Sequence, residues 1–131
     1  FYRAAVDYLL YTVRCYFLMY VEDPSDKGYI VRMEDHLQIT EEWLEKHSFL
    51  DDQYRADYWY FYCLLLQLKG EDTENALKKA SYFSGRVNET SKYKKLKALL
   101  RNLEKIGASG SKIGNLDLEI GNFYNMIVSF C

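Results

Sequence analysis

The longest uninterrupted apolar run in the chain lies near its middle. It consists of nine consecutive apolar or aromatic residues from Tyr58 to Leu66. A helix without a polar face must be covered on every side by other elements, and nine residues are too few to cross a bilayer, which takes about 20. A buried strand is the alternative, because aromatic side chains also favour strands.

The residues on either side of this run favour a helix. Asp51 and Asp52 can cap the start of a helix, and a cation followed by glycine, Lys69-Gly70, is typical of a helix end. The pattern therefore predicts a central helix that covers about residues 54–69.

Along most of the remaining chain, apolar residues recur every three or four positions, which is the spacing of one helix face. Ser25 or Asp26 is expected to cap the second helix, Thr90 or Ser91 to cap the fifth, and Gly107 to end the fifth. Besides the central helix, the predicted helices cover about residues 2–21, 27–46, 74–87, 92–106 and 116–130.

Residues that break helices are scarce. The chain has one proline and seven glycines, four of which lie between positions 107 and 121. This distribution favours long helices over a β protein with many turns. We therefore predict a single all-α domain, residues 1–131, of about six mostly antiparallel helices in a bundle or a helical stack around residues 54–69.

The first predicted helix, 2–21, is apolar over most of its circumference. Its charged residues Arg3, Asp7 and Arg14 share one narrow stripe, because offsets of 4 and 11 residues return to nearly the same face. These charges argue against a membrane span or a signal sequence. We expect this helix either to pack on several neighbours or to supply an interface.

The ends and the cysteines of the chain suggest its context. Residue 1 is phenylalanine and the chain ends at Cys131 within an apolar run, so we expect a fragment of a longer chain or a subunit of a complex. The three cysteines, Cys15, Cys63 and Cys131, are odd in number and widely spaced, which is typical of free thiols. We therefore expect an intracellular, cytoplasmic protein.

Patterns typical of catalysis or metal binding are absent from the sequence. It contains no Cys-x-x-Cys pair and no glycine-rich loop between a strand and a helix. The two histidines, His36 and His47, are eleven residues apart, which separates them by about 16 Å on a helix and is too far for one metal ion. We expect no enzymatic activity, no metal and no cofactor.

Charge is unevenly distributed along the chain. Residues 1–77 hold seven basic and fifteen acidic residues, a net charge of −8, whereas residues 78–105 hold nine basic and two acidic residues, a net charge of +7. On the fifth predicted helix a basic stripe falls opposite the leucine face. Its members are Lys94, Lys97, Arg101 and Lys105.

This stripe could follow the phosphates of RNA or single-stranded DNA. The alternative is a solvated lysine-rich face, or a docking surface for the acidic helix 27–46 of this or another copy. The mildly acidic pI of the chain, about 5.7, favours the alternative.

The central helix and the one after it resemble a tetratricopeptide-type hairpin. The first helix of that repeat has the order large, large, small, large, glycine, which is matched here by Trp59, Tyr62, Cys63, Leu66 and Gly70. Its second helix is matched by Ala76, Ala80 and Phe83. The chain departs from the pattern at Phe83, where a small residue is usual, and no proline closes the unit. Ordinary packing of a helical bundle is the alternative reading of the same residues.

The resemblance covers about residues 54–87 and implies stacked antiparallel helix pairs. It also implies a partner-binding groove lined by Asp57, Tyr60, Leu64 and Gln67. We therefore expect a non-enzymatic protein–protein interaction or scaffold module that binds a protein partner or self-associates through its first and sixth helices. A small nucleic-acid-binding subunit that uses the basic stripe is the alternative.

Overall fold

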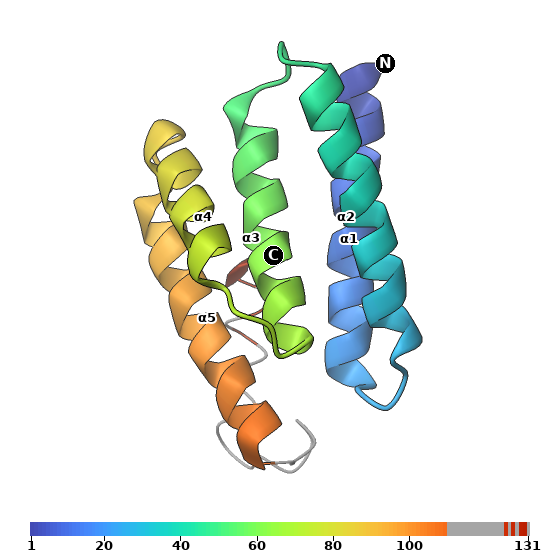
Figure 1. The fold of residues 1–131 in the computed structure, drawn as a ribbon, viewed down its shortest axis with the longest axis vertical. Coiled ribbons are helices and arrows are strands. Elements are labelled where there is room, and N and C mark those ends of the chain that lie inside the picture. The colour runs from blue at the N-terminus through green and yellow to red at the C-terminus, as the bar shows by residue number, and fades with distance from the viewer. Residues whose placement is uncertain (110–124, 126, 128, 131) are drawn as a thin grey trace.

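The structure, a computed structural model, describes residues 1–109, 125, 127, 129 and 130, and only the backbone of residues 105–109. The described part of the chain contains five helices and no strand, which confirms the all-α fold class (Figure 1). The helices are α1 (Tyr2–Glu22), α2 (Gly28–Lys46), α3 (Asp52–Leu68), α4 (Glu74–Arg86) and α5 (Thr90–Ser109).

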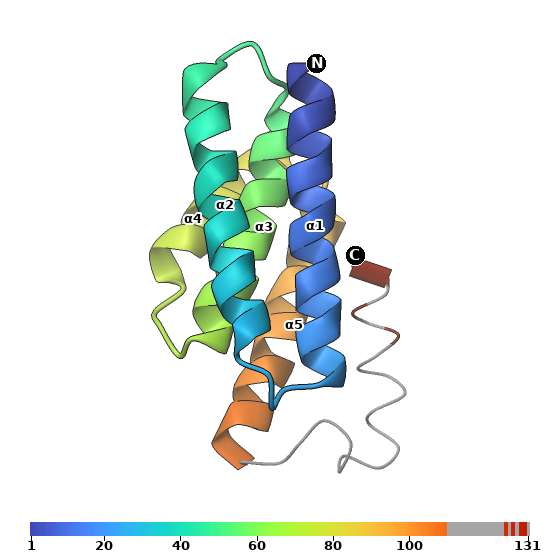
Figure 2. The ribbon, with the colours of Figure 1, turned by 90° about the vertical axis from the view of Figure 1, so that its right-hand side faces the viewer.

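Successive helices run antiparallel, and α3 lies at the centre with α1 and α2 on one side and α4 and α5 on the other (Figures 1 and 2). The central helix packs against each of the other four. The α1–α2 pair packs chiefly on α3, not on α4 or α5. Seven of the nine residues of the apolar run are buried, whereas Trp59 and Tyr62 are half-buried, so the predicted cover is confirmed for most of the run.

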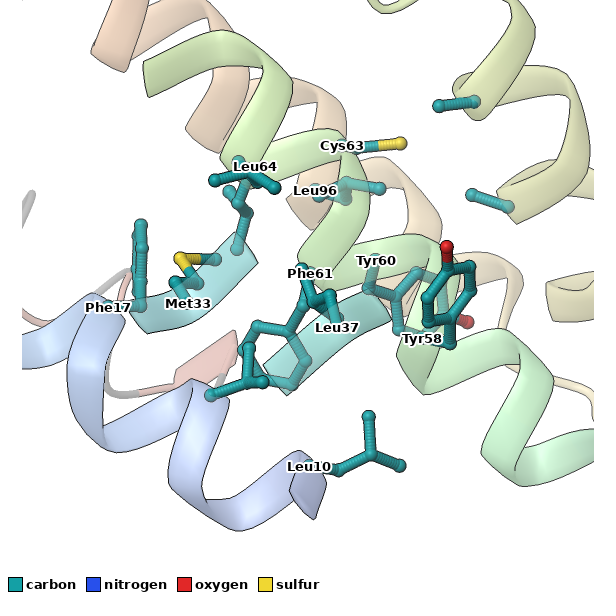
Figure 3. Packing of buried hydrophobic residues seen from close by; sticks show 14 of the residues in the cluster. Leu10, Phe17, Met33, Leu37, Tyr58, Tyr60, Phe61, Cys63, Leu64 and Leu96 are labelled. Carbon is teal, nitrogen blue, oxygen red and sulfur yellow. The ribbon is translucent and has the colours of Figure 1, made fainter. Parts of the chain in front are cut away.

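The core is built from side chains of α1, α2 and α5 that point toward α3 (Figure 3). Cys63, Leu64 and Leu65 of α3 are fully buried. Phe17 of α1, Met33 of α2 and Leu96 of α5 belong to the same buried cluster (Figure 3). On α4 the buried residues are small, Ala76 and Ala80 among them, which lets α4 approach α3 closely.

Two residues with positive φ end α3 and α4. Gly70 has φ 72°, and backbone bonds run from Glu71 N–H to Leu66 O (2.9 Å) and from Gly70 N–H to Gln67 O (3.1 Å). Asn88 has φ 58° after α4, where Glu89 N–H donates to Ser84 O at 2.8 Å. Glycine and asparagine are the residues that tolerate this left-handed conformation best.

The boundaries of α5 differ from the prediction at both ends. The helix begins at Thr90, because the turn at Asn88 closes α4 and leaves the chain free to start the next helix at once. It continues past Gly107 to Ser109, so the predicted stop at Gly107 is wrong. An interior glycine costs a helix only about 1 kcal/mol, and no proline follows to enforce an end.

The sixth predicted helix, 116–130, falls largely outside the described residues. Within it, residues 125, 127, 129 and 130 are helical, and Ile127 and Phe130 are buried.

Cys63 is a free, buried thiol and Cys15 is free and half-buried, whereas Cys131 lies outside the described residues. No helix in the described part of the chain is long and apolar enough to cross a membrane.

The position of Leu65 allows a test of the fold. Leu65 is 1% exposed in α3, so Leu65→Asp would bury an unpaired carboxylate and should lower the free energy of unfolding by about 4 kcal/mol or more. Urea unfolding followed by circular dichroism measures this. Ile39→Asp is the control, because Ile39 is 42% exposed on α2 and its substitution should cost less than about 1 kcal/mol. Equal losses for the two variants would contradict the central position of α3.

Candidate functional site

A cleft of about 200 Å³ lies where α1, α3 and the start of α5 meet, with Phe130 at its margin. Its charged and hydroxyl-bearing side chains come from all three helices. They are Asp7, Tyr11 and Arg14 of α1, Asp57 and Tyr60 of α3, and Lys92 of α5. The stripe of charged residues noted on α1 therefore faces this cleft through two of its members.

A hydrogen-bond network ties the cleft together. The Gln53 side-chain amide donates to Asp57 Oδ1 at 3.1 Å and to Glu89 Oε1 at 3.0 Å, and the Tyr60 hydroxyl donates to the same Glu89 oxygen at 3.1 Å. The turn at Asn88 carries Glu89 to this point, one residue before α5 begins. A carboxylate at a helix N-terminus is also favoured by the helix dipole.

Burial dominates the electrostatics of the cleft. It raises the pKa of Asp57 from its ordinary value of 3.8 to about 6, against the opposing effects of the Lys92 charge and the Gln53 hydrogen bond. The negative charges of Glu89 and Asp7 raise this pKa further. Burial and the neighbouring Glu89 also raise the pKa of Tyr60, so its hydroxyl stays protonated and acts as a donor.

Lys92 links the polar part of the cleft to its aromatic rim. Its ammonium lies 5.3 Å from the ring centroids of both Tyr60 and Phe130, and the two rings are 5.7 Å apart in an edge-on arrangement. A cation at this distance from two rings is held by their quadrupoles. The lysine charge thus remains close to Asp57 without a direct ion pair between them in the described structure.

The four residues implied by the tetratricopeptide resemblance do not share one open surface. Asp57 and Tyr60 line the cleft, but Tyr60 is only 1% exposed and Leu64 is 0% exposed within the core. Gln67 faces a separate depression near Leu103 and the turn after α3. The spacing does put them on one side of the helix, but α1 and α5 cover that side. Tyr60 and Leu64 are therefore not accessible to a partner in this structure.

The basic stripe lies on the surface of α5 as predicted. Lys94, Lys97 and Arg101 are exposed, whereas Leu96, Leu99, Leu100 and Leu103 of the same helix are buried. The side chain of Lys105 lies outside the described residues. The described residues include no acidic group in an ion pair with these three cations. Nucleic-acid binding by the stripe stays a prediction.

Metal ligands do not converge among the residues that the structure describes, where no group of three or more His, Cys, Asp or Glu side chains could hold an ion. The two histidines have other contacts. His36 Nδ1 lies 2.9 Å from the Arg32 carbonyl oxygen, and the His47 ring stacks on Tyr2 with 4.1 Å between centroids.

Sequence reasoning did not identify Gln53, Glu89 and Lys92 as neighbours of Asp57. Gln53 and Glu89 are 36 residues apart, and no motif joins a residue in the first turn of one helix to the turn that follows the next helix. The stripe of Arg3, Asp7 and Arg14 was the one available signal, because charges in line on an otherwise apolar helix indicate a polar site on that side.

Comparisons of the chain with protein-family models, with curated proteins and with solved structures gave no match.

The raised pKa of Asp57 predicts a specific dependence of stability on pH. The folded state favours the neutral form of the Asp57 carboxyl group. This contribution to the free energy of unfolding is fully present below about pH 4 and is lost as the pH rises through about 6. Asp57→Asn keeps an acceptor for Gln53 but has no charge to bury. It should therefore be more stable than the natural protein by about 2 kcal/mol at pH 7.5, with the difference disappearing near pH 4.

Chemical unfolding of both proteins across this pH range measures the effect. Asp35→Asn is the matched control, because Asp35 is exposed on α2 and lies outside the cleft. A stability difference for Asp57→Asn that is the same at pH 4 and pH 7.5 would show that burial does not govern this carboxyl group.

Proposed function

We propose that the protein is a non-enzymatic protein–protein interaction module and that α1 supplies its main contact surface. The observation that supports this most strongly is the composition of the outward face of α1. Tyr8 is 67% exposed and Met19 is 49% exposed, although both are large and largely apolar. Tyr11 is exposed between them at the edge of the cleft.

The charged residues of α1 do not lie on this outward face. Asp7 and Arg14 face the cleft, and the side of the helix opposite its buried residues carries Ala4, Tyr8, Cys15 and Met19, with no charge before Glu22. A helix face that is only solvated carries charged residues. Tyrosine and methionine are enriched in the centres of protein interfaces, so this face has the composition of a contact surface.

The order of the helices also supports an interaction module of the tetratricopeptide type. Two antiparallel pairs, α1–α2 and α3–α4, follow one another, and α5 continues the series against α3 and α4. In stacked repeats each pair buries its face against the next, and the pair at the end leaves one face uncovered. Within the described part of the chain, the exposed side chains Tyr8, Tyr11 and Met19 give α1 such a face.

The sixth predicted helix contributes less to the proposal than α1. Of its described residues, Ile127 and Phe130 are buried, and Phe130 packs on Tyr60. These two side chains point inward and are not available to a partner. The proposed contact surface therefore consists of the outward face of α1.

Nucleic-acid binding is the second candidate function. It is favoured by Lys94, Lys97 and Arg101, which are exposed on one face of α5 and have no acidic partner among the described residues. Tyr93 lies beside them, with its ring centroid 5.0 Å from Lys97 Nζ. A basic stripe with an aromatic side chain is suited to a single strand, whose unpaired bases can stack.

The first test concerns the α1 surface. Multi-angle light scattering at micromolar concentration should show self-association, or a partner should co-purify, and Tyr8→Glu with Met19→Glu should abolish the association because it places two charges in an apolar contact. Tyr82→Glu is the control, because Tyr82 is 59% exposed on α4, away from this surface. A soluble monomer without a partner, before any substitution, would contradict the proposal.

The second test concerns the basic stripe. Neutralising three phosphates of a single strand gives a logarithmic salt slope of about −2, so the affinity for labelled RNA should fall about twentyfold between about 50 and 200 mM salt. Lys97→Glu with Arg101→Glu should abolish binding without a large change in melting temperature, because both side chains are exposed. Absence of binding at low salt would remove this candidate.

A further inference from the structure

A second cleft, of about 280 Å³, lies on the side of α3 that faces away from Asp57. Trp59 follows Asp57 by two residues, which turns its side chain by about 200° around the helix axis. The cleft opens between α2 and α4, which pack on α3 rather than closely on each other. It is lined by Glu41 and Glu45 of α2, Tyr58 and Trp59 of α3, and Lys79 and Phe83 of α4.

The floor of this cleft is aromatic. The rings of Tyr58 and Trp59 meet edge-on with 5.0 Å between centroids, and Tyr58 is buried whereas Trp59 is half-buried. The Lys79 ammonium already lies 5.9 Å from the Trp59 ring centroid. Tryptophan attracts cations more strongly than the other aromatic side chains, and Lys79 shows that a cation can reach this ring from the open side of the cleft.

The α2 wall of the cleft carries two carboxylates without a cation. Glu41 accepts a hydrogen bond of 3.2 Å from the Tyr58 hydroxyl, and neither it nor Glu45 forms an ion pair with any residue that the structure describes. They are four residues apart on one helix, where like charges repel. A cation placed between them would relieve that repulsion.

The other basic residue of the cleft does not fill this role. Arg55 donates hydrogen bonds to the carbonyl oxygens of Leu44 (3.1 Å) and Leu50, and it lies 3.9 Å from Asp52. Its guanidinium therefore joins the end of α2 to the start of α3 and is not directed to Glu41 or Glu45. The cleft thus combines an aromatic floor with two exposed carboxylates that form no ion pair with any described residue.

We propose that this cleft binds the side chain of an arginine presented by a partner protein. A guanidinium is planar, so it can stack on Trp59 while it donates to Glu45 and Glu41. The cleft is slightly smaller than the range of about 300–1,000 Å³ typical of pockets for drug-sized ligands, which suits one long side chain. When no partner is present, the Lys79 ammonium occupies the position near the Trp59 ring that the guanidinium would take. This site uses none of the α1 residues of the proposed contact surface.

The test uses two peptides and the indole N–H signals of the natural protein. Acetyl-Gly-Arg-Gly-amide is titrated at low salt, and the same peptide with citrulline, which has the shape of arginine without its charge, is the matched control. The Trp59 signal should shift and saturate with a dissociation constant of about 1 mM, the Trp43 signal should not, and the citrulline peptide should have no effect. A Trp43→Phe variant assigns the two signals.

Two further variants on α2 separate a specific site from general attraction to an acidic helix. Glu45→Gln should weaken binding of the arginine peptide about threefold to tenfold, because it removes one charge-assisted hydrogen bond. Glu42→Gln changes the same charge on the exposed side of α2 outside the cleft, and it should alter binding by less than about twofold.

A third variant, Lys79→Ala on α4, should strengthen binding of the arginine peptide, because it removes the cation that competes for the Trp59 ring.

Three results would overturn the proposal. The first is equal binding of the arginine and citrulline peptides, and the second is an equal loss of affinity in Glu42→Gln and Glu45→Gln. The third is the absence of a saturable shift of the Trp59 signal. The melting temperature of each variant, measured in parallel, confirms that the protein remains folded, and the Tyr8→Glu, Met19→Glu variant should bind the arginine peptide unchanged.

Discussion

A helix with apolar side chains on every side cannot be stable at a surface, and α3 is such a helix. Its burial requires four neighbours, and α1, α2, α4 and α5 each pack against it. Because the hydrophobic effect is not directional, it favours burial of the apolar surface of α3 but does not specify which helix buries it. The antiparallel order with short connections then assigns the neighbours, because consecutive helices pack most readily beside one another.

Both clefts follow from the way in which α3 is covered. Helices are cylinders, so neighbours that pack on a central helix leave grooves where they diverge from one another. The polar or aromatic side chains of α3 that line these grooves are Asp57, Tyr60 and Phe61 on one side and Arg55, Tyr58 and Trp59 on the other. Each hydroxyl donates to a glutamate of a neighbouring element, Tyr60 to Glu89 and Tyr58 to Glu41. A buried hydroxyl without such a partner would cost stability.

The two clefts differ in how their charges are balanced. Around Asp57, the cations Arg14 and Lys92 share the cleft with the acids, and Gln53 is hydrogen-bonded to both Asp57 and Glu89. Around Trp59, the acids of α2 face only Lys79 across the cleft, since Arg55 is held by backbone oxygens. In the first cleft Gln53 therefore links α3 to the start of α5 through Glu89, whereas Glu41 and Glu45 of the second cleft are exposed and form no ion pair with any described residue.

The sequence by itself determined the all-α class, the five described helices to within two or three residues at most ends, and the burial of most of the run from Tyr58 to Leu66. These properties depend on local periodicity, on capping residues and on glycine, which act over a few residues. It also determined that Lys94, Lys97 and Arg101 lie opposite the leucines of α5, because a helix fixes its own faces. The failed stop at Gly107 shows the limit of local rules, since one glycine is a weak breaker.

Only the tertiary structure decided which faces of α3 remain open. Spacing placed Asp57, Tyr60, Leu64 and Gln67 on one side of a helix, but the packing of α1 and α5 buried two of them and separated the others. The proximity of Gln53 to Glu89, and of Glu45 to Trp59 and Lys79, likewise depends on how three helices meet. Residues tens of positions apart carry no local signal of contact, because the interaction exists only after the chain has packed.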